Sequence, residues 1–409
     1  MASATDLFPV TAPARAEPQP RRRPLRMRTW ATAAFAVVVI VTVASAWGLP
    51  RPGLLIAPWT AVGAAERAGA VAPRYRASAF HRFLLGDGYR ELWTTPIRAP
   101  LVDLHAFAGG LTPLRRGGGR QTRSLRLHGA DGREYVFRSL DKDQAQLSPI
   151  ARATIGRVRQ DQVSALHPAA ALVAAGLEDA AGIPHTTPQI AVMPDAAALG
   201  AFGKDFGGLV GTLQEYPRAG FAGASRMEGT DELWVALRQA PRDRVDVRAY
   251  LAVRLMDVYL GDWDRHPGQL RWGRIERGGV GTWFPIPRDR DYAFADYGGV
   301  LPAIARRFDR KVVRFDGIYR DLPGLLAKPR EMDERLLCGV PLTTWDSTAT
   351  SMARSLTDAA IAAAIGRMPR EYVARSAPLA ATLRARRAAL PIAARRFHAH
   401  LQAGCARQR

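Results

Sequence analysis

The sequence predicts an α+β protein with two lobes, a β-rich lobe followed by a larger helical lobe, behind one N-terminal transmembrane or signal segment. Three observations carry this prediction. Polar and apolar residues alternate at strand spacing between about residues 109 and 140, helical patterns dominate beyond Asp231, and an uncharged apolar run lies near the N-terminus. The chain has 409 residues and is 47% hydrophobic, which is ample for a packed core.

The composition divides the chain into five segments. We expect a disordered basic cytoplasmic tail over 1–29, a transmembrane helix or signal segment over 30–47, a Pro-, Gly- and Ala-rich linker over 48–74, a β-rich N-lobe over 75–217 and a helical C-lobe over 218–409.

The apolar run 30–47 carries no charge and follows an arginine cluster over 21–28. This positive flank predicts a cytoplasmic N-terminus and a body outside the cytoplasm. Two outcomes stay open: a single-pass membrane anchor, or a signal peptide cleaved after Ala46 that leaves a secreted or periplasmic protein. The competing interpretation is an ordinary buried helix. We expect the protein to contact the membrane through this segment.

The formal net charge of +21 comes almost entirely from arginine. The lysines are Lys142, Lys204, Lys311 and Lys328. The arginines are spread along the chain and no basic stripe is interleaved with aromatic residues, so we expect no nucleic-acid partner. Cys338 and Cys405 match no metal-ligand spacing and are compatible with a disulfide or with two free thiols.

The N-lobe elements follow from short-range patterns. Residues 124–128 and 135–138 alternate like strands around the turn Ala130-Asp131-Gly132. The pattern over residues 161–181 predicts a helix or a helix pair. Two further strands are predicted over residues 190–193 and 209–216.

Two acidic loops stand out in the C-lobe. The helix predicted over Val247–Leu260 ends at Gly261 and leads into Asp262-Trp263-Asp264-Arg265-His266, with Gln269 close behind. A strand over 283–286 leads into Arg288-Asp289-Arg290-Asp291. Carboxylates, a guanidinium and an imidazole at such close spacing are the groups that serve as a base, a metal ligand and their positioning partners. Asp-rich turns that only cap helices and strands would explain one such loop, but two poorly.

A glycine-rich stretch precedes the first pair of N-lobe strands. It comprises Gly117, Gly118 and Gly119, followed by Gln121 and Thr122. Such a loop can cover phosphate groups, although a flexible hairpin accounts for glycines at least as often. The second strand ends at Arg138, and Lys142 follows it. Both side chains can supply cations for nucleotide phosphates.

The two loops resemble the catalytic and metal loops of atypical kinases. In a protein kinase, a catalytic Asp precedes a metal-binding amide by about five residues, and a second metal-binding Asp follows near the next strand pair. Asp264 and Gln269 have this spacing, and Asp291 follows. Related patterns occur in phosphoinositide kinases, HipA, the spore-coat kinase CotH and the animal secretory-pathway kinases. The chain is most similar to an uncharacterised group of exported bacterial kinase-like proteins, over roughly residues 75–400.

This resemblance implies a two-lobed protein-kinase-like fold and a role for each matching residue. Asp264 would be the catalytic carboxylate, beside Arg265 and His266. Gln269, Asp291 and Asp289 would bind Mg²⁺ or Mn²⁺. ATP or another nucleoside triphosphate would meet Gly117, Gly118, Gly119, Gln121, Thr122, Arg138, Lys142 and, at the hinge, Glu215. The helix glutamate expected to pair with the lysine is not obvious, and Glu178 or Asp161 with Gln162 are the candidates.

The sequence therefore favours a nucleotide- and metal-dependent phosphotransferase acting on a protein, lipid or glycan hydroxyl at the cell envelope. Gln in place of Asn and Asp-Tyr-Ala in place of Asp-Phe-Gly keep a second hypothesis open, an inactive kinase-like binding module. A third is another metal-dependent transferase or phosphodiesterase that uses Asp262 with Asp264 and Asp289 with Asp291 as carboxylate pairs.

Overall fold

The computed structural model describes residues 48–117, 121–144 and 155–407. The predicted basic tail and the predicted transmembrane or signal segment lie outside these ranges. Within them, no helix combines the length and the apolar character needed to cross a bilayer.

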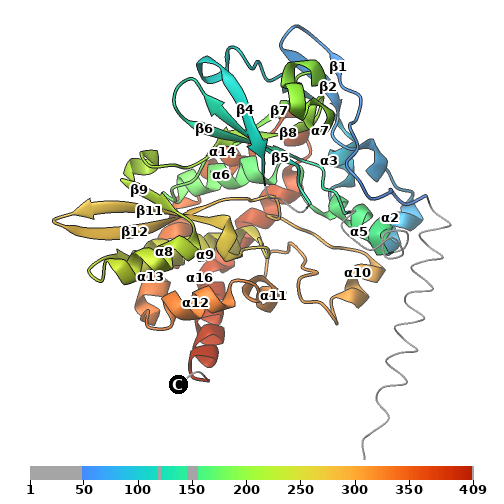
Figure 1. The fold of residues 1–409 in the computed structure, drawn as a ribbon. Helices are drawn as coiled ribbons and strands as arrows, with labels where there is room; N and C mark the ends of the chain where they lie inside the picture. The colour runs from blue at the N-terminus through green and yellow to red at the C-terminus, as the bar shows by residue number, and fades with distance from the viewer. Residues whose placement is uncertain (1–47, 118–120, 145–154, 408–409) are drawn as a thin grey trace, which may run out of the picture.

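The chain forms a mixed α+β structure with a β-sheet region and a helical region, as predicted, and this arrangement is compatible with a kinase-like fold (Figure 1). The five-stranded sheet lies at the top of the view, and most of the helices lie below it.

The first elements correct the predicted linker. An antiparallel three-stranded sheet contains β1 (Thr60–Ala61), β2 (Glu66–Ala70) and β3 (Pro96–Pro100). Between the last two strands lie η1 (Pro73–Tyr75), α2 (Ala79–Leu85) and α3 (Arg90–Thr94). Val71 and Ala72 are fully buried, so residues 60–72 belong to the folded body. Small residues suggested a linker, but they also permit close packing.

A second sheet forms the core of the N-lobe. Its strand order is β4-β5-β6-β8-β7, and every neighbouring pair is antiparallel. The strands are β4 (Leu111–Arg116), β5 (Ser124–Gly129), β6 (Glu134–Ser139), β7 (Gln189–Val192) and β8 (Val210–Glu215), which confirms the strands predicted over 124–128, 135–138, 190–193 and 209–216.

The two faces of this sheet differ because side chains alternate along each strand. Leu125, Leu127, Phe137 and Leu213 lie on one face, in a hydrophobic cluster that also contains Phe206. The covering segment contains η4 (Ala196–Phe202) and α7 (Gly203–Phe206). The opposite face is polar: Arg138 lies opposite Ser124 on one side and Thr212 on the other.

The range predicted as a helix or helix pair, 161–181, contains the short η3 (Gln162–Ala165) and the helix α6 (Ala170–Ala180), and α5 (Ile155–Asp161) ends where this range begins. Gly176 of α6 leaves no room for a side chain, because an added Cβ would lie 2.6 Å from the Cα of Ala364. That alanine belongs to the C-terminal half, so α6 packs against the helical region although it precedes the predicted lobe boundary at 217.

The C-terminal half contains a smaller sheet of order β10-β12-β11-β9 and a set of helices. Its elements are η5 (Phe221–Gly223), β9 (Arg226–Glu228), α8 (Thr230–Gln239), β10 (Arg244–Val245), α9 (Val247–Leu260), η6 (Pro267–Gln269), β11 (Leu270–Arg277), β12 (Val280–Pro287), α10 (Val300–Ala305), α11 (Leu322–Leu326), α12 (Arg330–Leu337), α13 (Leu342–Ser355), α14 (Asp358–Ile365), α15 (Arg370–Val373) and α16 (Ala377–Cys405).

Helix α9 is the centre of the helical half and has the bounds predicted from its sequence. Asp246 caps its N-terminus by accepting a hydrogen bond from the Ala249 N–H, and Gly261 ends it in a left-handed conformation with φ 68°. Ten of its 14 residues are buried, among them Arg254 and Asp257, so these two charged side chains must find partners inside the protein.

A disulfide joins Cys338, just after α12, to Cys405 at the end of α16. It selects one of the two cysteine states that the sequence left open. The bond ties the C-terminal helix back onto the helical half.

Candidate functional site

The polar face of the five-stranded sheet meets the loop that follows β12 through two ion pairs. Arg138 on β6 donates to both carboxylate oxygens of Asp289 at 2.7 Å and lies 3.6 Å from Asp291. Lys142 Nζ donates a short hydrogen bond to Asp291 Oδ2. The structure thus brings together four residues that the sequence assigned to one site.

The electrostatics of this pairing favour an ionised Asp291. Burial raises the pKa of its carboxyl, but Lys142 and Arg138 outweigh burial and hold the pKa below its ordinary value. Lys142 is buried, and its ammonium lies 4.5 Å from the centre of the Tyr292 ring. The carboxylates of Asp289 and Asp291 are therefore already paired with the side chains of Arg138 and Lys142.

The backbone around Asp291 is strained at two positions. Asp289 has φ 63° and Phe294 has φ 62°, in a region that residues other than glycine seldom adopt. Strained residues of this kind cluster at functional sites, where the surrounding structure holds them in place.

Described residues that flank the glycine-rich stretch lie next to this loop or in the neighbouring strand. An added Cβ at Gly117 would meet Ser124 Oγ at 1.8 Å, so the close approach of the strands requires glycine there. Tyr292 donates a 2.8 Å hydrogen bond to Gln121 Oε1, and Lys142 Nζ lies 3.5 Å from Thr122 Oγ1. Gly118 and Gly119 lie outside the described residues.

Asp264 follows the end of α9 and is held by two side chains. Lys328, beyond α11, donates a short hydrogen bond to Oδ1, and Gln269 Nε2 donates to Oδ2 at 3.1 Å. His266 is partly buried, and its Nδ1 accepts a hydrogen bond from the Gly268 N–H. Burial lowers the pKa of His266, and the nearby Lys328 ammonium lowers it further.

Arg265, next to Asp264 in the sequence, is engaged by other residues of the protein. Its side chain is fully buried and donates to Asp257 on α9 and to Asp262, and its Nη1 donates to the main-chain oxygens of Gln269 and Arg288 at 3.0 and 2.8 Å. These contacts connect the two acidic loops, as a positioning residue would, and the catalytic role of Arg265 stays a prediction.

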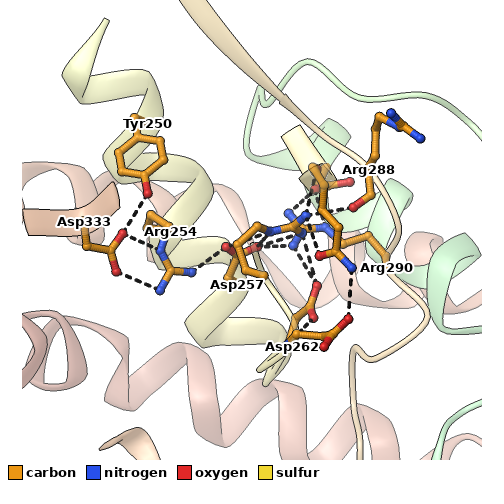
Figure 2. Close-up of polar contacts among 11 residues, drawn as sticks. Tyr250, Arg254, Asp257, Asp262, Arg288, Arg290 and Asp333 are labelled. Atoms are coloured by element: carbon orange, nitrogen blue, oxygen red, sulfur yellow. Dashed lines mark hydrogen bonds and ion pairs between the residues drawn. The ribbon is translucent and has the colours of Figure 1, made fainter. Parts of the chain in front are cut away.

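Asp262 belongs to the same buried network (Figure 2). Arg265 and Arg290 contact its Oδ2 at 3.2 and 3.1 Å, and its side chain is inaccessible to solvent. Burial raises the pKa of Asp262. The carboxylate pair that a different metal-dependent enzyme would draw from Asp262 and Asp264 is therefore not available.

The network extends along α9 through alternating charges. Asp257 contacts Arg254, Arg265 and Arg290, and Arg254 continues to Asp333 on α12 at 2.8 Å. Tyr250 donates to Asp333 at 2.8 Å. Charges buried in this way are retained only when each is paired and hydrogen-bonded, so the network locks the loops to the helix beneath them.

Aromatic residues bring the two acidic loops into contact. The ring centroids of Trp263, next to Asp264, and Tyr292, next to Asp291, lie 4.9 Å apart in an edge-to-face arrangement. The two carboxylates also raise the pKa of Tyr292, although burial is the larger cause.

The carboxylates of Asp289 and Asp291 suit a divalent cation, because Mg²⁺ is bound by one or two carboxylates together with substrate phosphates. Gln269 does not suit this role. Its Oε1 lies 3.3 Å from the buried Arg265 Nη1, and its Nε2 is bound to Asp264. Across the described ranges, no group of three or more His, Cys, Asp and Glu side chains is arranged to hold a metal.

Three other residues lie where the resemblance did not place them. Glu215 is paired with Arg133 at 3.5 Å, and it is the neighbouring Gln214 that lines the cavity described next. Glu178 binds Arg290, and Asp161 binds Arg90. Neither pairs with Lys142, whose carboxylate partner in the structure is Asp291.

A small cavity of about 50 Å³ lies between the sheet and the loop after β12. It is lined by Arg138 and Lys142, by Thr212 and Gln214 of β8, and by residues 287–291.

The sequence missed Lys328 as a site residue. The clue that the sequence offers is that lysine is rare in this chain. In a chain that uses arginine for almost every positive charge, two of the lysines, Lys142 and Lys328, contact the two carboxylates that the loop patterns singled out.

Comparison with known proteins gives little further guidance. No family model and no curated protein matches the chain. A solved structure of the Helicobacter pylori proinflammatory kinase CtkA aligns over 71% of this chain and 96% of its own, with 11% identity and a TM-score of 0.37. Values this low do not establish a shared activity.

Proposed function

We propose that the protein is a kinase-like phosphotransferase that uses ATP or another nucleoside triphosphate with Mg²⁺ or Mn²⁺. The observation that carries this proposal is the pairing of Lys142 with Asp291 and of Lys328 with Asp264 on two loops that touch. A reaction that transfers a phosphoryl group needs a carboxylate for the acceptor hydroxyl and cations around the phosphates, and this arrangement provides both.

Each residue then has a separate task. Asp264 would accept a hydrogen bond from the acceptor hydroxyl, held in orientation by Gln269. Lys142 and Arg138 would contact the phosphates of the nucleotide. Asp291 and Asp289 would hold the divalent cation, which neutralises charge on the phosphates when bound.

We place the acceptor, a protein, lipid or glycan hydroxyl, at the cell envelope. The uncharged segment 30–47 behind an arginine cluster supports an exported body, and the disulfide between Cys338 and Cys405 supports an oxidising surrounding.

The test is nucleotide-dependent thermal stabilisation of the full chain, with Mg²⁺, with Mn²⁺ and without metal. A ligand that binds only the folded state raises the melting temperature. We expect stabilisation for the wild type, little for Asp291→Asn, and wild-type behaviour for Asp309→Asn, which removes an exposed carboxylate elsewhere. The absence of stabilisation with every nucleotide and metal in a folded wild-type protein would refute the proposal.

A second candidate, an inactive kinase-like binding module, is favoured by one observation. Gln269, the amide expected to bind the metal, is instead engaged by Arg265 and Asp264. If purified protein binds nucleotide but transfers no phosphoryl group to water, to itself or to added hydroxyl compounds, this candidate replaces the first.

A further inference from the structure

Tyr216, directly after β8, is surrounded by four arginine side chains from different parts of the chain. The guanidinium carbons of Arg126, Arg288, Arg218 and Arg271 lie 3.0, 4.7, 5.3 and 5.6 Å from the centre of its ring. Arg126 comes from β5, Arg271 from β11 and Arg288 from the end of β12. We call Tyr216 with Arg126, Arg271 and Arg288 the Tyr216 cluster.

The positive charge of this cluster is not balanced. Glu134 lies 3.6 Å from Arg126, but it is shared with Arg218, to which it is bound at 2.5 Å. Within the described part of the chain, Arg271 and Arg288 form no ion pair. Arginine side chains gathered with so little opposing charge repel one another, and a bound anion would relieve this repulsion.

The hydrogen-bond donors of the cluster are also incompletely used. Arg126 Nη1 and Arg271 Nε are buried and have no hydrogen-bond acceptor within the described residues. Among the residues that the structure describes, the Arg288 side chain donates only to the Tyr216 hydroxyl, at a long 3.4 Å. Buried donors without partners are costly, and each one needs an explanation.

The pKa shifts of Arg288 and Tyr216 are consistent with a positive electrostatic potential at the cluster. Burial lowers the pKa of Arg288 to about 10, together with repulsion from Arg126, Arg138 and Arg271. Burial raises the pKa of the Tyr216 hydroxyl, but the surrounding arginines outweigh it and lower that pKa overall. Figure 2 shows that the Arg288 side chain points away from the buried charge network below it.

We propose that the Tyr216 cluster binds the phosphate group of a small ligand. Guanidinium groups are planar donors that match phosphate oxygens two at a time, and a phosphate offers both the charge and the acceptors that the cluster lacks. The Tyr216 hydroxyl supplies one more donor. The site adjoins the acidic loop, since Arg288 directly precedes Asp289. It does not depend on the proposed phosphoryl transfer.

The experiment is calorimetric titration of the full chain with inorganic phosphate, without metal and at constant ionic strength. Arg271→Gln and Arg288→Gln should each weaken phosphate binding by about tenfold to a hundredfold, the effect of losing a hydrogen bond to a charged group. Arg277→Gln is the matched control, because Arg277 is exposed on the same strand as Arg271 and its loss changes the net charge equally. We expect it to bind phosphate like the wild type.

Melting temperatures without phosphate separate a binding role from a structural one. Arg288→Gln relieves repulsion, so its melting temperature should equal or exceed that of the wild type in phosphate-free buffer, while the stabilisation by added phosphate is lost. A folded wild type that binds no phosphate, or equal affinities in the wild type and both arginine variants, would overturn the proposal.

ATP identifies the source of the phosphate. If ATP competes with inorganic phosphate, and if Arg271→Gln weakens the binding of ATP, the cluster holds a nucleotide phosphate. If ATP and inorganic phosphate bind at the same time, the Tyr216 cluster holds the phosphate group of a ligand other than the nucleotide. Both results support the cluster as a phosphate site. Phosphate binding that persists when no nucleotide binds would reject the proposed phosphotransferase and leave the cluster standing.

Discussion

Lys328 and Asp264 are 64 residues apart in the chain, and the lysine ammonium donates directly to the carboxylate. The lysine also lies 5.8 Å from the centre of the Trp263 ring. It therefore supplies the positive charge at the one carboxylate that the proposed reaction would place beside the acceptor.

Replacing this lysine tests whether the charge serves turnover. Lys328→Gln should lower kcat, because the Asp264 carboxylate loses the side chain that holds its Oδ1, and should leave nucleotide affinity largely unchanged. Lys311→Gln, an exposed lysine elsewhere, is the control. Steady-state kinetics with a nucleotide-binding titration measure both quantities.

The same variant has a spectroscopic consequence that does not require activity. Since burial and Lys328 both lower the pKa of His266, Lys328→Gln should shift that pKa upward. An NMR titration of the histidine ring protons would detect the shift. An unchanged pKa would mean that the ammonium is not near His266 in solution.

Asp264→Asn and Asp291→Asn should fail in different ways. A catalytic carboxylate contributes about 10²- to 10⁴-fold to rate, so Asp264→Asn should lose turnover and keep metal–nucleotide binding. Asp291→Asn should lose the binding itself. If the two defects are exchanged, the assigned roles are reversed, and if neither variant changes anything the site is inactive.

Gln269→Ala should resemble Asp264→Asn more than Asp291→Asn. The amide contacts Asp264 and Arg265, so its loss frees the Asp264 carboxylate and leaves the proposed metal ligands Asp289 and Asp291 in place. We expect a lower kcat with an unchanged metal requirement. A raised metal concentration for half-maximal activity would instead restore Gln269 as a metal ligand.

Asp243 should make stability depend on pH on the acid side. Hydrogen bonds from Arg274 at 2.6 Å, and also from the Gly281 N–H and the Trp283 ring, lower its pKa from 3.8 to about 2. A carboxyl whose pKa is lower in the folded state stabilises above its unfolded pKa, and this stability is lost as pH falls through the folded value. Urea unfolding of the wild type and Asp243→Asn should therefore differ at pH 6 and converge near pH 2. A constant difference across this range would contradict the assignment.

Reduction of the disulfide should destabilise the protein. Cys338 and Cys405 close a loop with a sequence separation of 67, for which the chain-entropy model gives about 4 kcal/mol. The urea midpoint of the wild type should fall when a reducing agent is added. The double variant Cys338→Ser with Cys405→Ser should show the lower midpoint in both conditions.

Elements that depend on local pattern were predictable from the sequence. The helix Val247–Leu260 forms with its predicted bounds, because Asp246 and Gly261 mark its ends by local rules. The strands around the turn at Asp131 form because their alternation matches one apolar and one polar face of the sheet.

Partnerships between distant residues were not predictable. Arg265 has the sequence context of a catalytic loop, but its burial is decided by Asp257 on α9 and by the main-chain oxygen of Arg288. Lys328 lies in a stretch without a motif, and only the fold brings it to Asp264. Similarly, the small residues before Val71 gave no sign that they would pair as strands.

The chain closes on itself over almost its full length. Arg375, in the segment after α15, binds Glu91 of α3 at 2.7 Å, across a sequence separation of 284 residues, and Trp93 shares one hydrophobic core with Phe397 of α16. Contacts of this range cannot form until the last helix has been synthesised. They also slow folding, because the entropy of closing a long loop is lost before the contacts stabilise the chain. The main core therefore cannot be completed before α16 has been made, and until then apolar surface of the kind that promotes aggregation stays exposed.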